Sequence, residues 1–357
     1  MTQLEIFRAT VEHRPHSAFM FYASFTPDLS GRLREKYGIA NDGDIRPFFG
    51  MYDPSGIQPE EPQMKKTPDF SEYFADVEKP EGSFINGAGI LEIPAHFHHF
   101  TGYVSPLRNA RKFSDLERFP FPPATGFDAG GMKEKVEQAH REGRVAATWV
   151  GHMYECAWQV RGYEEFLFDT VDKPEWCDYI LDRFMERNFN IAVLAAKAGV
   201  DMITTGDDIA NQNSLMFSLP MWRHFIKEKW AKVYAAAKEI KPDIQIWYHS
   251  DGNVTEIIPE MIEIGLTVLN PVQPECVDVA NLKKVYGKQL VFDGTIGTQT
   301  TMPFGSLEEV KRVVRERKKE LGCDGALIIS PTHVLEPEVP IENIEAFISA
   351  CRETAEA

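Results

Sequence analysis

The chain has 357 residues, of which 43% are hydrophobic and 26% charged, and this is the composition of a folded globular protein. Its formal net charge of −16 argues against nucleic acid or an anionic membrane as the main partner, because both would repel it. The five cysteines are scattered and lack a C-x-x-C pair, so they indicate neither a disulfide framework nor a thiolate zinc site. The N-terminal segment lacks a signal-peptide core, and no apolar run approaches the ~18 residues of a membrane span. We therefore expect a cytoplasmic protein.

The first third of the chain shows few regular patterns. Residues 40–130 are rich in proline and glycine, and we interpret them as irregular cap or lid insertions. One strand is expected within them, over 84–93, and it leads into His96, His98 and His99, which we assign to packing or to the surface. Before this region, apolar spacing predicts a helix over 1–13, a strand over 17–26 and a helical segment around 29–37.

From residue 131 onward, strands and helices alternate. Such alternation with short loops requires parallel strands joined by helical crossovers. We therefore predict an α/β fold, a (β/α)8 TIM barrel with an elaborated N-terminal region, as one domain over residues 1–357. An open nucleotide-binding sheet is disfavoured because no strand is followed by a G-x-G-x-x-G turn. Ser218 and Ser306 are expected to cap the helices that follow them. The expected strands are 145–150, 201–205, 244–248, 267–269, 289–292 and 326–330, and the expected helices are 131–142, 163–170, 173–198, 219–240, 254–264, 279–285, 306–321 and 340–354.

Polar side chains gather where the predicted strands end, and in such a barrel these ends form the active-site face. The strand 244–248 continues into His249 and Asp251, which are two residues apart and so leave an extended backbone on the same face. His333 follows the last strand. Imidazole and carboxylate suit zinc, and three protein ligands with one open position are typical of a catalytic site. The pattern predicts a metal site at His249, Asp251 and His333; the alternative is that they are hydrogen-bonded rim residues without a metal.

The remaining strand ends supply candidates for acid–base chemistry and for substrate binding. Glu155 and Asp208 are the predicted catalytic groups, acting as acid, base or further ligand. The alternatives are that Glu155 is pocket wall and that Asp207 and Asp208 cap the following loop. Amide side chains can orient a substrate but cannot exchange protons. The predicted substrate-binding residues are His152, Asp207, Asn211, Gln212, Asn270, Gln273 and Asp293.

Several segments at these strand ends resemble the uroporphyrinogen decarboxylase superfamily. They are RGYEEFLFD (161–169), GDDIANQNSLMFSLPMWRHFIKEKW (206–230), WYHSDGN (247–253), GTIGTQTTMPFG (294–305) and ISPTHVLEPEVPIENI (329–344). True decarboxylases of this superfamily carry an N-terminal R-Q-A-G-R segment that grips substrate propionates, and this chain lacks it. Its nearest equivalent, MFYASFTPDLSGR, offers only Arg32. The resemblance is therefore closer to the cobalamin-dependent methyltransferase-like branch.

That branch holds zinc with an H-x-C pair and a later cysteine. In this chain His249 matches the histidine, Asp251 stands at the first cysteine position, and the later cysteine falls at or beside His333. The resemblance thus implies a metal site with harder ligands, which suits an oxygen substrate or water better than a thiol. It also implies zinc and a corrinoid as cofactors, the corrinoid being carried by a partner protein, and pairing of the barrels into homodimers.

Three functions remain open from the sequence. The first is an enzyme that moves a methyl group from a small O- or N-methylated substrate to a corrinoid protein. The second is a decarboxylase or lyase that acts on a tetrapyrrole or another carboxylated ring. The third is a non-catalytic barrel that binds a corrinoid or a small ligand. The basic content of the pocket separates the first two, because substrate carboxylates need cationic partners.

Overall fold

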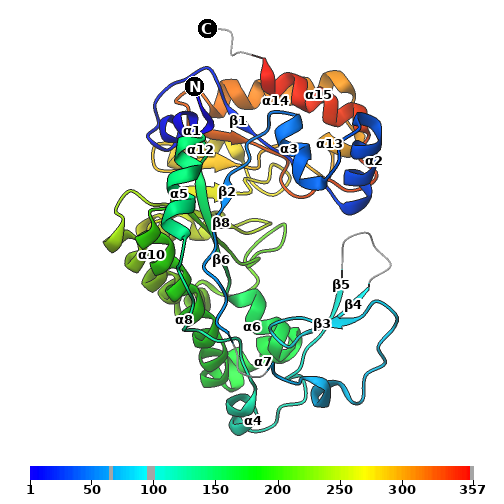
Figure 1. Ribbon diagram of the computed structural model, residues 1–357, viewed down its shortest axis with the longest axis vertical. Helices are drawn as coiled ribbons and strands as arrows, with labels where there is room; N and C mark the ends of the chain where they lie inside the picture. Colours follow the sequence, from blue (N-terminus) through cyan, green and yellow to red (C-terminus); the bar gives the residue numbers. More distant parts are fainter. Residues whose placement is uncertain (64–66, 95–100, 354–357) are drawn as a thin grey trace.

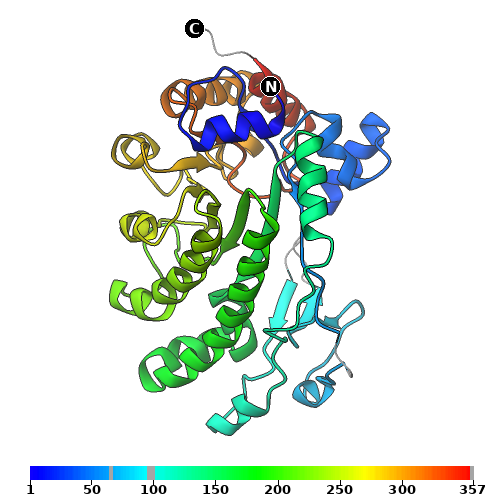
Figure 2. The ribbon, with the colours of Figure 1, turned by 60° about the vertical axis from the view of Figure 1, so that its left-hand side comes forward.

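The computed structural model describes residues 1–63, 67–94 and 101–353, and within them eight parallel strands form one curled sheet. From β2 to β11, each strand of this sheet pairs with the next one in the chain, and β11 pairs with β1. Figures 1 and 2 show the helices on the outer side of this sheet. The predicted (β/α)8 TIM-barrel fold is confirmed. The strands are β1 (Met20–Phe21), β2 (Ser55–Gly56), β6 (Ala146–His152), β7 (Met202–Gly206), β8 (Gln245–His249), β9 (Val268–Asn270), β10 (Val291–Asp293) and β11 (Leu327–Ile329).

The two end strands of the sheet, β1 and β2, are linked through the main chain. Tyr52, which precedes β2, donates its backbone N–H to the carbonyl oxygen of Phe21 in β1 at 2.7 Å. At one end of the barrel, Leu4 and Phe7 pack into a buried cluster with strand residues such as Met20 and Val268. Burying one such side chain contributes about 1.5–3 kcal/mol, so this end is a packed core and not a channel.

The helices agree with the predicted positions to within a few residues over most of the chain. Ser218 accepts the backbone N–H of Met221 at 3.5 Å and Ser306 that of Glu309 at 3.2 Å, which confirms both predicted caps. None of the helices in the described part of the chain is long and apolar enough to cross a membrane. The helices are α1 (Gln3–Val11), α2 (Pro27–Tyr37), α3 (Ile45–Phe48), α4 (Phe113–Arg118), α5 (Met132–Arg141), α6 (Tyr154–Arg161), α7 (Tyr163–Asp172), α8 (Pro174–Ala198), α9 (Leu219–Trp222), α10 (Glu228–Ile240), α11 (Ile258–Glu263), α12 (Val279–Tyr286), α13 (Thr301–Phe304), α14 (Leu307–Leu321) and α15 (Ile341–Arg352).

Two predicted elements differ in the structure. The helix predicted over 219–240 is interrupted by a π-helical turn, Arg223–Lys227, whose wider hydrogen-bond spacing separates α9 from α10. The strand predicted over 84–93 is a hairpin of β3 (Phe84–Ile85) and β4 (Leu91–Pro94). Its turn forms because the Asn86 side chain accepts the backbone N–H groups of Ala88 and Ile90. The predicted cluster His96, His98 and His99 lies outside the described residues.

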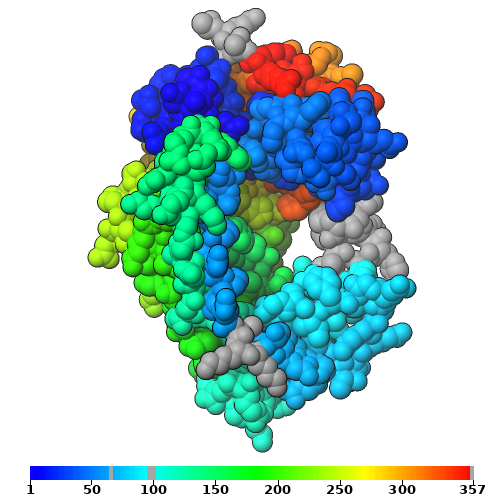
Figure 3. All heavy atoms as spheres, in the orientation of Figure 1, coloured from blue at the N-terminus to red at the C-terminus, as the bar shows by residue number. Residues whose placement is uncertain are grey.

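Between β2 and α5 the chain forms a small three-stranded antiparallel sheet, in which β4 pairs with both β3 and β5 (Thr101–Val104). This sheet is attached to the barrel through α6. Tyr103 packs edge-on against Trp158 with ring centroids 6.0 Å apart, and Leu107 donates its N–H to the carbonyl of Val160 at 2.9 Å. Figure 3 shows the surface hollowed between this cyan part and the blue N-terminal segment. The lid role of residues 40–130 and the single-domain assignment stay predictions.

Candidate metal site and barrel rim

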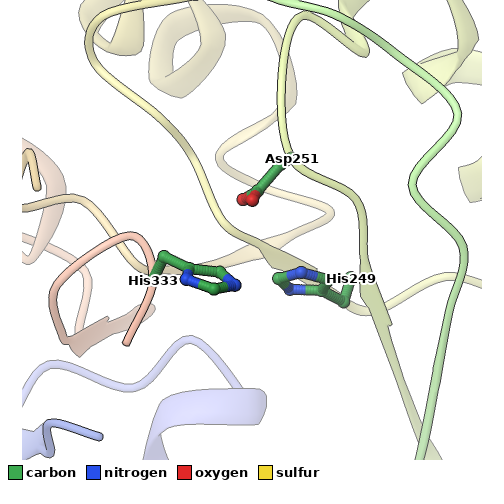
Figure 4. Close-up of side chains that lie close together, drawn as sticks. All are labelled: His249, Asp251 and His333. Carbon is green, nitrogen blue, oxygen red and sulfur yellow. The ribbon is translucent and has the colours of Figure 1, made fainter. Parts of the chain in front are cut away.

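Three predicted ligands converge at the carboxyl ends of the barrel strands. His249 ends β8, Asp251 follows it by two residues, and His333 lies just beyond β11. One ligand atom from each of the three lies within 4.8 Å of the others. Figure 4 shows the Asp251 carboxylate directed toward the gap between the two imidazole rings. The fold therefore brings together His249 and His333, which are 84 positions apart in the chain.

A chain of hydrogen bonds through Asn270 and Tyr22 to Asp293 fixes the orientation of the His249 ring. Its Nδ1 lies 2.7 Å from Asn270 Oδ1, the Asn270 amide nitrogen donates to Tyr22 Oη at 3.4 Å, and Tyr22 donates to Asp293 Oδ2 at 2.9 Å. Because the Asn270 oxygen can only accept, Nδ1 of His249 carries the hydrogen. In the neutral imidazole, Nε2 then keeps the lone pair with which histidine binds a metal.

Asp251 has the features of a carboxylate that lacks a cation. Its Oδ1 is buried and has no hydrogen-bond partner among the described residues. Burial and the nearby charge of Asp208 raise the pKa of Asp251, whereas His249 and His333 act in the opposite direction. A buried unpaired acceptor costs about 1–3 kcal/mol, and a bound cation would remove that cost. Two imidazoles and one carboxylate therefore fit zinc or a similar divalent ion.

Two of the three metal candidates, Asp251 and His333, border a cavity of about 240 Å³. Its wall carries hydroxyl and amide groups, and Gln273 is fixed there because its Oε1 accepts the N–H of Gly252 at 3.1 Å. Apart from His333, none of the described residues that line this cavity is basic. The cavity suits a small polar ligand. The other wall residues are Thr298, Gln299, Thr332, Val334, Glu336 and Val339.

A His–Glu pair lies on the neighbouring part of the rim, at the end of β6. His152 Nδ1 lies 2.9 Å from Glu155 Oε1 and 2.9 Å from the carbonyl oxygen of Gly206. Burial lowers the pKa of His152, but the hydrogen bond and charge of Glu155 outweigh it and raise the pKa to about 9. Burial raises the pKa of Glu155, but the hydrogen bond from His152 outweighs it and leaves that pKa lowered. At neutral pH the pair is therefore an imidazolium and a carboxylate.

Asp207 positions this pair from inside the protein. Its Oδ1 accepts the backbone N–H groups of Met153 at 2.8 Å and Glu155 at 3.0 Å, and its Oδ2 accepts the indole N–H of Trp230 at 3.0 Å. Asp207 is fully buried, and burial raises its pKa to about 7. One ligand atom from each of His152, Glu155 and Asp207 also lies within 4.8 Å of the others. Because both carboxylates of this cluster already accept hydrogen bonds, we do not assign a metal to it, and Asp207 positions the His152–Glu155 pair.

Comparison with known proteins shows the family. The model for "Uroporphyrinogen decarboxylase (URO-D)" matches residues 145–354, which is more than half of the chain. The chain belongs to the URO-D family. The predicted resemblance is confirmed.

Two methyltransferases are among the proteins that this chain is similar to. A methylated-thiol–coenzyme M methyltransferase from Methanosarcina mazei is 24% identical over 202 residues, which cover 56% of this chain and 51% of that protein. The match thus spans about half of that relative's length. A solved methyltransferase from Methanosarcina mazei superposes with a TM-score of 0.64 at 17% identity, covering 98% of each chain, and shows the same fold. Within the family, the chain is closer to the methyltransferase-like branch.

Several predicted site residues of this URO-D protein have other roles in the structure. Asp207 and Asp293 were predicted to bind substrate, but both are buried, with exposed fractions of 0% and 1%, and their oxygens accept bonds from the protein. Asn211 was predicted likewise, but its Oδ1 accepts the N–H groups of Asn213 and Ser214 and shapes its own loop. Their side chains are short acceptors that satisfy nearby N–H groups, which a spacing pattern cannot distinguish from substrate contacts.

Other predicted residues do face the barrel mouth. Asp208 is 43% exposed at its side chain, accepts the N–H of Asp251 at 2.8 Å and has Oδ1 3.7 Å from His249 Nε2. Gln212 is exposed and donates to Gln299 at 3.0 Å, joining the loops after β7 and β10. Asn270, by contrast, does not face the mouth: its side-chain oxygen accepts the hydrogen bond from His249. Glu155, predicted to act as acid, base or further ligand, holds its carboxylate toward His152, and the hydrogen bond from His152 keeps the pKa of Glu155 lowered.

Two residues that support the site were not predicted. Tyr22 and Trp247 donate to Asp293 Oδ2, each at 2.9 Å, and Trp247 also stacks on His249 with ring centroids 5.9 Å apart. Trp247 lies within β8 and Tyr22 directly follows β1, and at such positions an aromatic residue is normally assigned to the core. The barrel places β1 near β10, so the Tyr22 hydroxyl reaches Asp293. Only the structure shows that this hydroxyl makes a hydrogen bond in the site.

Proposed function

We propose that the protein is a methyltransferase that moves a methyl group from a small O- or N-methylated substrate to a corrinoid carried by a partner protein. The observation that carries the proposal is the convergence of His249, Asp251 and His333 around an unsatisfied carboxylate oxygen. The methyltransferase names of the two similar proteins support the same class of reaction. The relative named above acts on a methylated thiol, so the substrate here must be argued from the site.

The ligand set favours an oxygen or nitrogen substrate over a thiol. The resemblance implies thiolate ligands in the methyltransferase branch, and this chain has a carboxylate and an imidazole in their place. A metal held by harder ligands is a harder Lewis acid and prefers oxygen or nitrogen donors. A divalent ion held by these three residues would polarise the heteroatom that bears the methyl group.

Transfer breaks the bond between the methyl carbon and the heteroatom, and the bonding electron pair stays on the heteroatom. A reduced corrinoid would supply the nucleophile that accepts the methyl group. The leaving heteroatom then requires a proton, and His152 carries one on an imidazolium that Glu155 holds in place. Asp208 faces the same mouth and can orient the substrate beside His249.

The alternative, decarboxylation of a carboxylated ring, is less well supported by the pocket. Among the described residues, the wall of the cavity beside the metal candidates contains no lysine or arginine. Arg32, the closest counterpart of the family's substrate arginines, donates to the carbonyl oxygen of Pro337 at 2.7 Å. Substrate carboxylates would meet the acidic groups Asp251 and Glu336 and be repelled. The third alternative is a non-catalytic barrel that binds a ligand. It differs from the first two because it predicts no turnover of a substrate.

The test combines metal analysis with a transfer assay. We expect about one zinc ion per chain in wild-type protein purified without chelators and much less in His333→Ala. His224→Ala is the matched control, because His224 pairs with Asp178 on the outer helices, and it should keep its metal. In the assay, cob(I)alamin is incubated with a methyl ether or a methylated amine, and methylation is followed by absorbance. No metal in reconstituted wild type would remove the basis of the proposal, and metal without turnover would favour the binding barrel.

A further inference from the structure

A second and larger cavity lies beside the rim, at the end of β6. It measures about 720 Å³ and lies between β6, α8 and three segments of the region that connects β2 with β6. This volume is within the range of pockets that hold drug-sized ligands. It is separate from the cavity at His333, because the two sets of lining residues share no member. Its apolar wall is made by Pro59, Pro62, Ala88, Trp149, Phe184 and Ile191.

The polar side chains in this wall are occupied by the protein itself. Arg187 donates to the carbonyl oxygen of Pro123 at 3.0 Å and to the Glu61 carboxylate. Asn188 donates to the carbonyl oxygen of His152 at 3.2 Å. Burial raises the pKa of Cys156 to about 12, so its thiol stays neutral. A charged ligand would therefore lose its hydration without gaining a free partner charge, whereas an apolar ligand would gain from burial.

One end of the cavity reaches the catalytic rim. Trp149 is 40% exposed, and its ring lies edge-on to His152 with centroids 4.9 Å apart. Gly206 separates His152 from His249: an added Cβ there would lie 3.4 Å from His152 Cε1 and 3.0 Å from His249 Cβ. A side chain at 206 would therefore contact both histidines. His152 thus belongs both to the cavity wall and to the rim that holds the metal candidates.

We propose that this cavity binds an uncharged aromatic ring, the body of the methyl donor, with its heteroatom directed toward His152. The inference rests on the proposed function, because it takes the ligand to be the methyl-bearing substrate. A ring fits the flat face of Trp149 and the proline-lined wall, and it brings no charge that the wall cannot pair. The cavity then selects the donor by its apolar body, while the polar rim acts on the heteroatom.

The test measures binding directly, by calorimetric titration of metal-loaded protein with methoxybenzene, 4-methoxybenzoate and tetramethylammonium. We expect methoxybenzene to bind at least about tenfold more tightly than the two charged probes, a difference of about 1.4 kcal/mol. Ala88→Leu places extra volume in the cavity and should weaken methoxybenzene binding about tenfold or more. Ala235→Leu, the same change on the exposed face of α10, should leave binding unchanged.

The outcomes separate this inference from the proposed function. Equal affinity in wild type and in folded Ala88→Leu, or tighter binding of either charged probe, would overturn the aromatic site. If Ala88→Leu does not fold, Trp149→Ala serves instead and should also weaken binding about tenfold. Methyl transfer from an aliphatic ether with no binding of methoxybenzene would keep the function and reject this site. Specific methoxybenzene binding without methyl transfer would keep the site and reject the function.

Discussion

His249 Nδ1 lies 2.7 Å from the side-chain oxygen of Asn270, and this contact determines which nitrogen of the imidazole is available to a metal. Asn270 is in turn held by Tyr22, which donates to the buried Asp293. The predicted ligand is thus the end of a hydrogen-bond chain that crosses the barrel interior. Such supporting contacts fix the tautomer and the ring orientation, and their loss typically lowers metal affinity by about 10–100-fold.

Asn270→Leu tests this chain. The substitution removes the acceptor for His249 Nδ1–H and keeps a side chain of similar size, so we expect zinc affinity to fall by about 10–100-fold. Competition with a chelator of known affinity measures the change. Asn281→Leu, at an exposed position on α12, is the control and should bind zinc like wild type. Unchanged zinc affinity in folded Asn270→Leu would show that His249 is oriented by other contacts or is not a ligand.

Asp251→Asn should have opposite effects on the metal-free and the metal-loaded protein. The substitution removes a carboxylate whose pKa is raised by burial and whose Oδ1 lacks a partner among the described residues. A neutral amide costs less to bury than a carboxylate, so we expect the free energy of unfolding in EDTA at pH ~7 to rise by about 1–3 kcal/mol. Added zinc should then stabilise the variant far less than wild type, because one ligand is lost. Thermal melts of both proteins with EDTA and with zinc give the comparison, and equal zinc stabilisation would exclude Asp251 as a ligand.

The barrel was predictable from the sequence because its signals are local and repeated. After residue 131, six apolar runs of strand length are each followed by polar residues, and each corresponds to a strand of the barrel. Ser218 and Ser306 predict two helix starts that the structure confirms. The first two barrel strands are only two residues long, so no such run could identify their bounds. The hairpin at Asn86 was missed because a single side chain makes the turn.

The candidate site was predictable only in part. His249, Asp251 and His333 could be named because each stands just after a strand, and barrel geometry places such positions together. The roles of Asp207 and Asp208 could not be told apart, because adjacent residues on a strand end point to opposite sides. One accepts bonds from α6 and Trp230, and the other faces the mouth. Local spacing carries no information on which partner each carboxylate meets across the sheet.

Asp207→Asn tests whether Asp207 positions the rim without touching substrate. Asn keeps one oxygen for Met153 and Glu155 but presents its amide N–H₂ to the indole N–H of Trp230. Two facing donors leave buried groups unpaired, so we expect a loss of about 1–3 kcal/mol in the free energy of unfolding. Trp230→Phe removes the indole donor but also shrinks a fully buried side chain, so it should cost at least as much. If Asp207 acts through α6, kcat should fall in both variants while metal content stays at the wild-type level; loss of metal from Asp207→Asn would contradict a purely positioning role.

The ion pair between His152 and Glu155 should give stability a defined pH dependence. The folded-state pKa of His152 is raised to about 9, so its contribution is fully present below its unfolded pKa of about 6.5 and is lost as pH rises through 9. The pKa of Glu155 is lowered, so its contribution is present above about pH 4.3 and is lost as pH falls through the folded pKa. The pair should therefore stabilise the protein most between about pH 4.3 and 6.5.

A double-mutant cycle isolates this pair. It compares wild type, His152→Gln, Glu155→Gln and the double mutant by urea unfolding. Asp207, Asp208 and His249 are present in all four proteins, so their direct effects cancel. We expect a coupling energy of about 1.5–3 kcal/mol at pH ~6 and a smaller one of about 0.5–1.5 kcal/mol at pH ~10, where the neutral imidazole can still donate from Nδ1 to the carboxylate. The exposed pair Arg312–Glu316 on α14 is the control, with a coupling of about 0.3–0.5 kcal/mol at both pH values, because its guanidinium stays charged. A coupling between His152 and Glu155 that does not change from pH ~6 to ~10 would show that the imidazole is not the group that holds the proton, and the proton source for the leaving heteroatom would have to lie elsewhere on the rim.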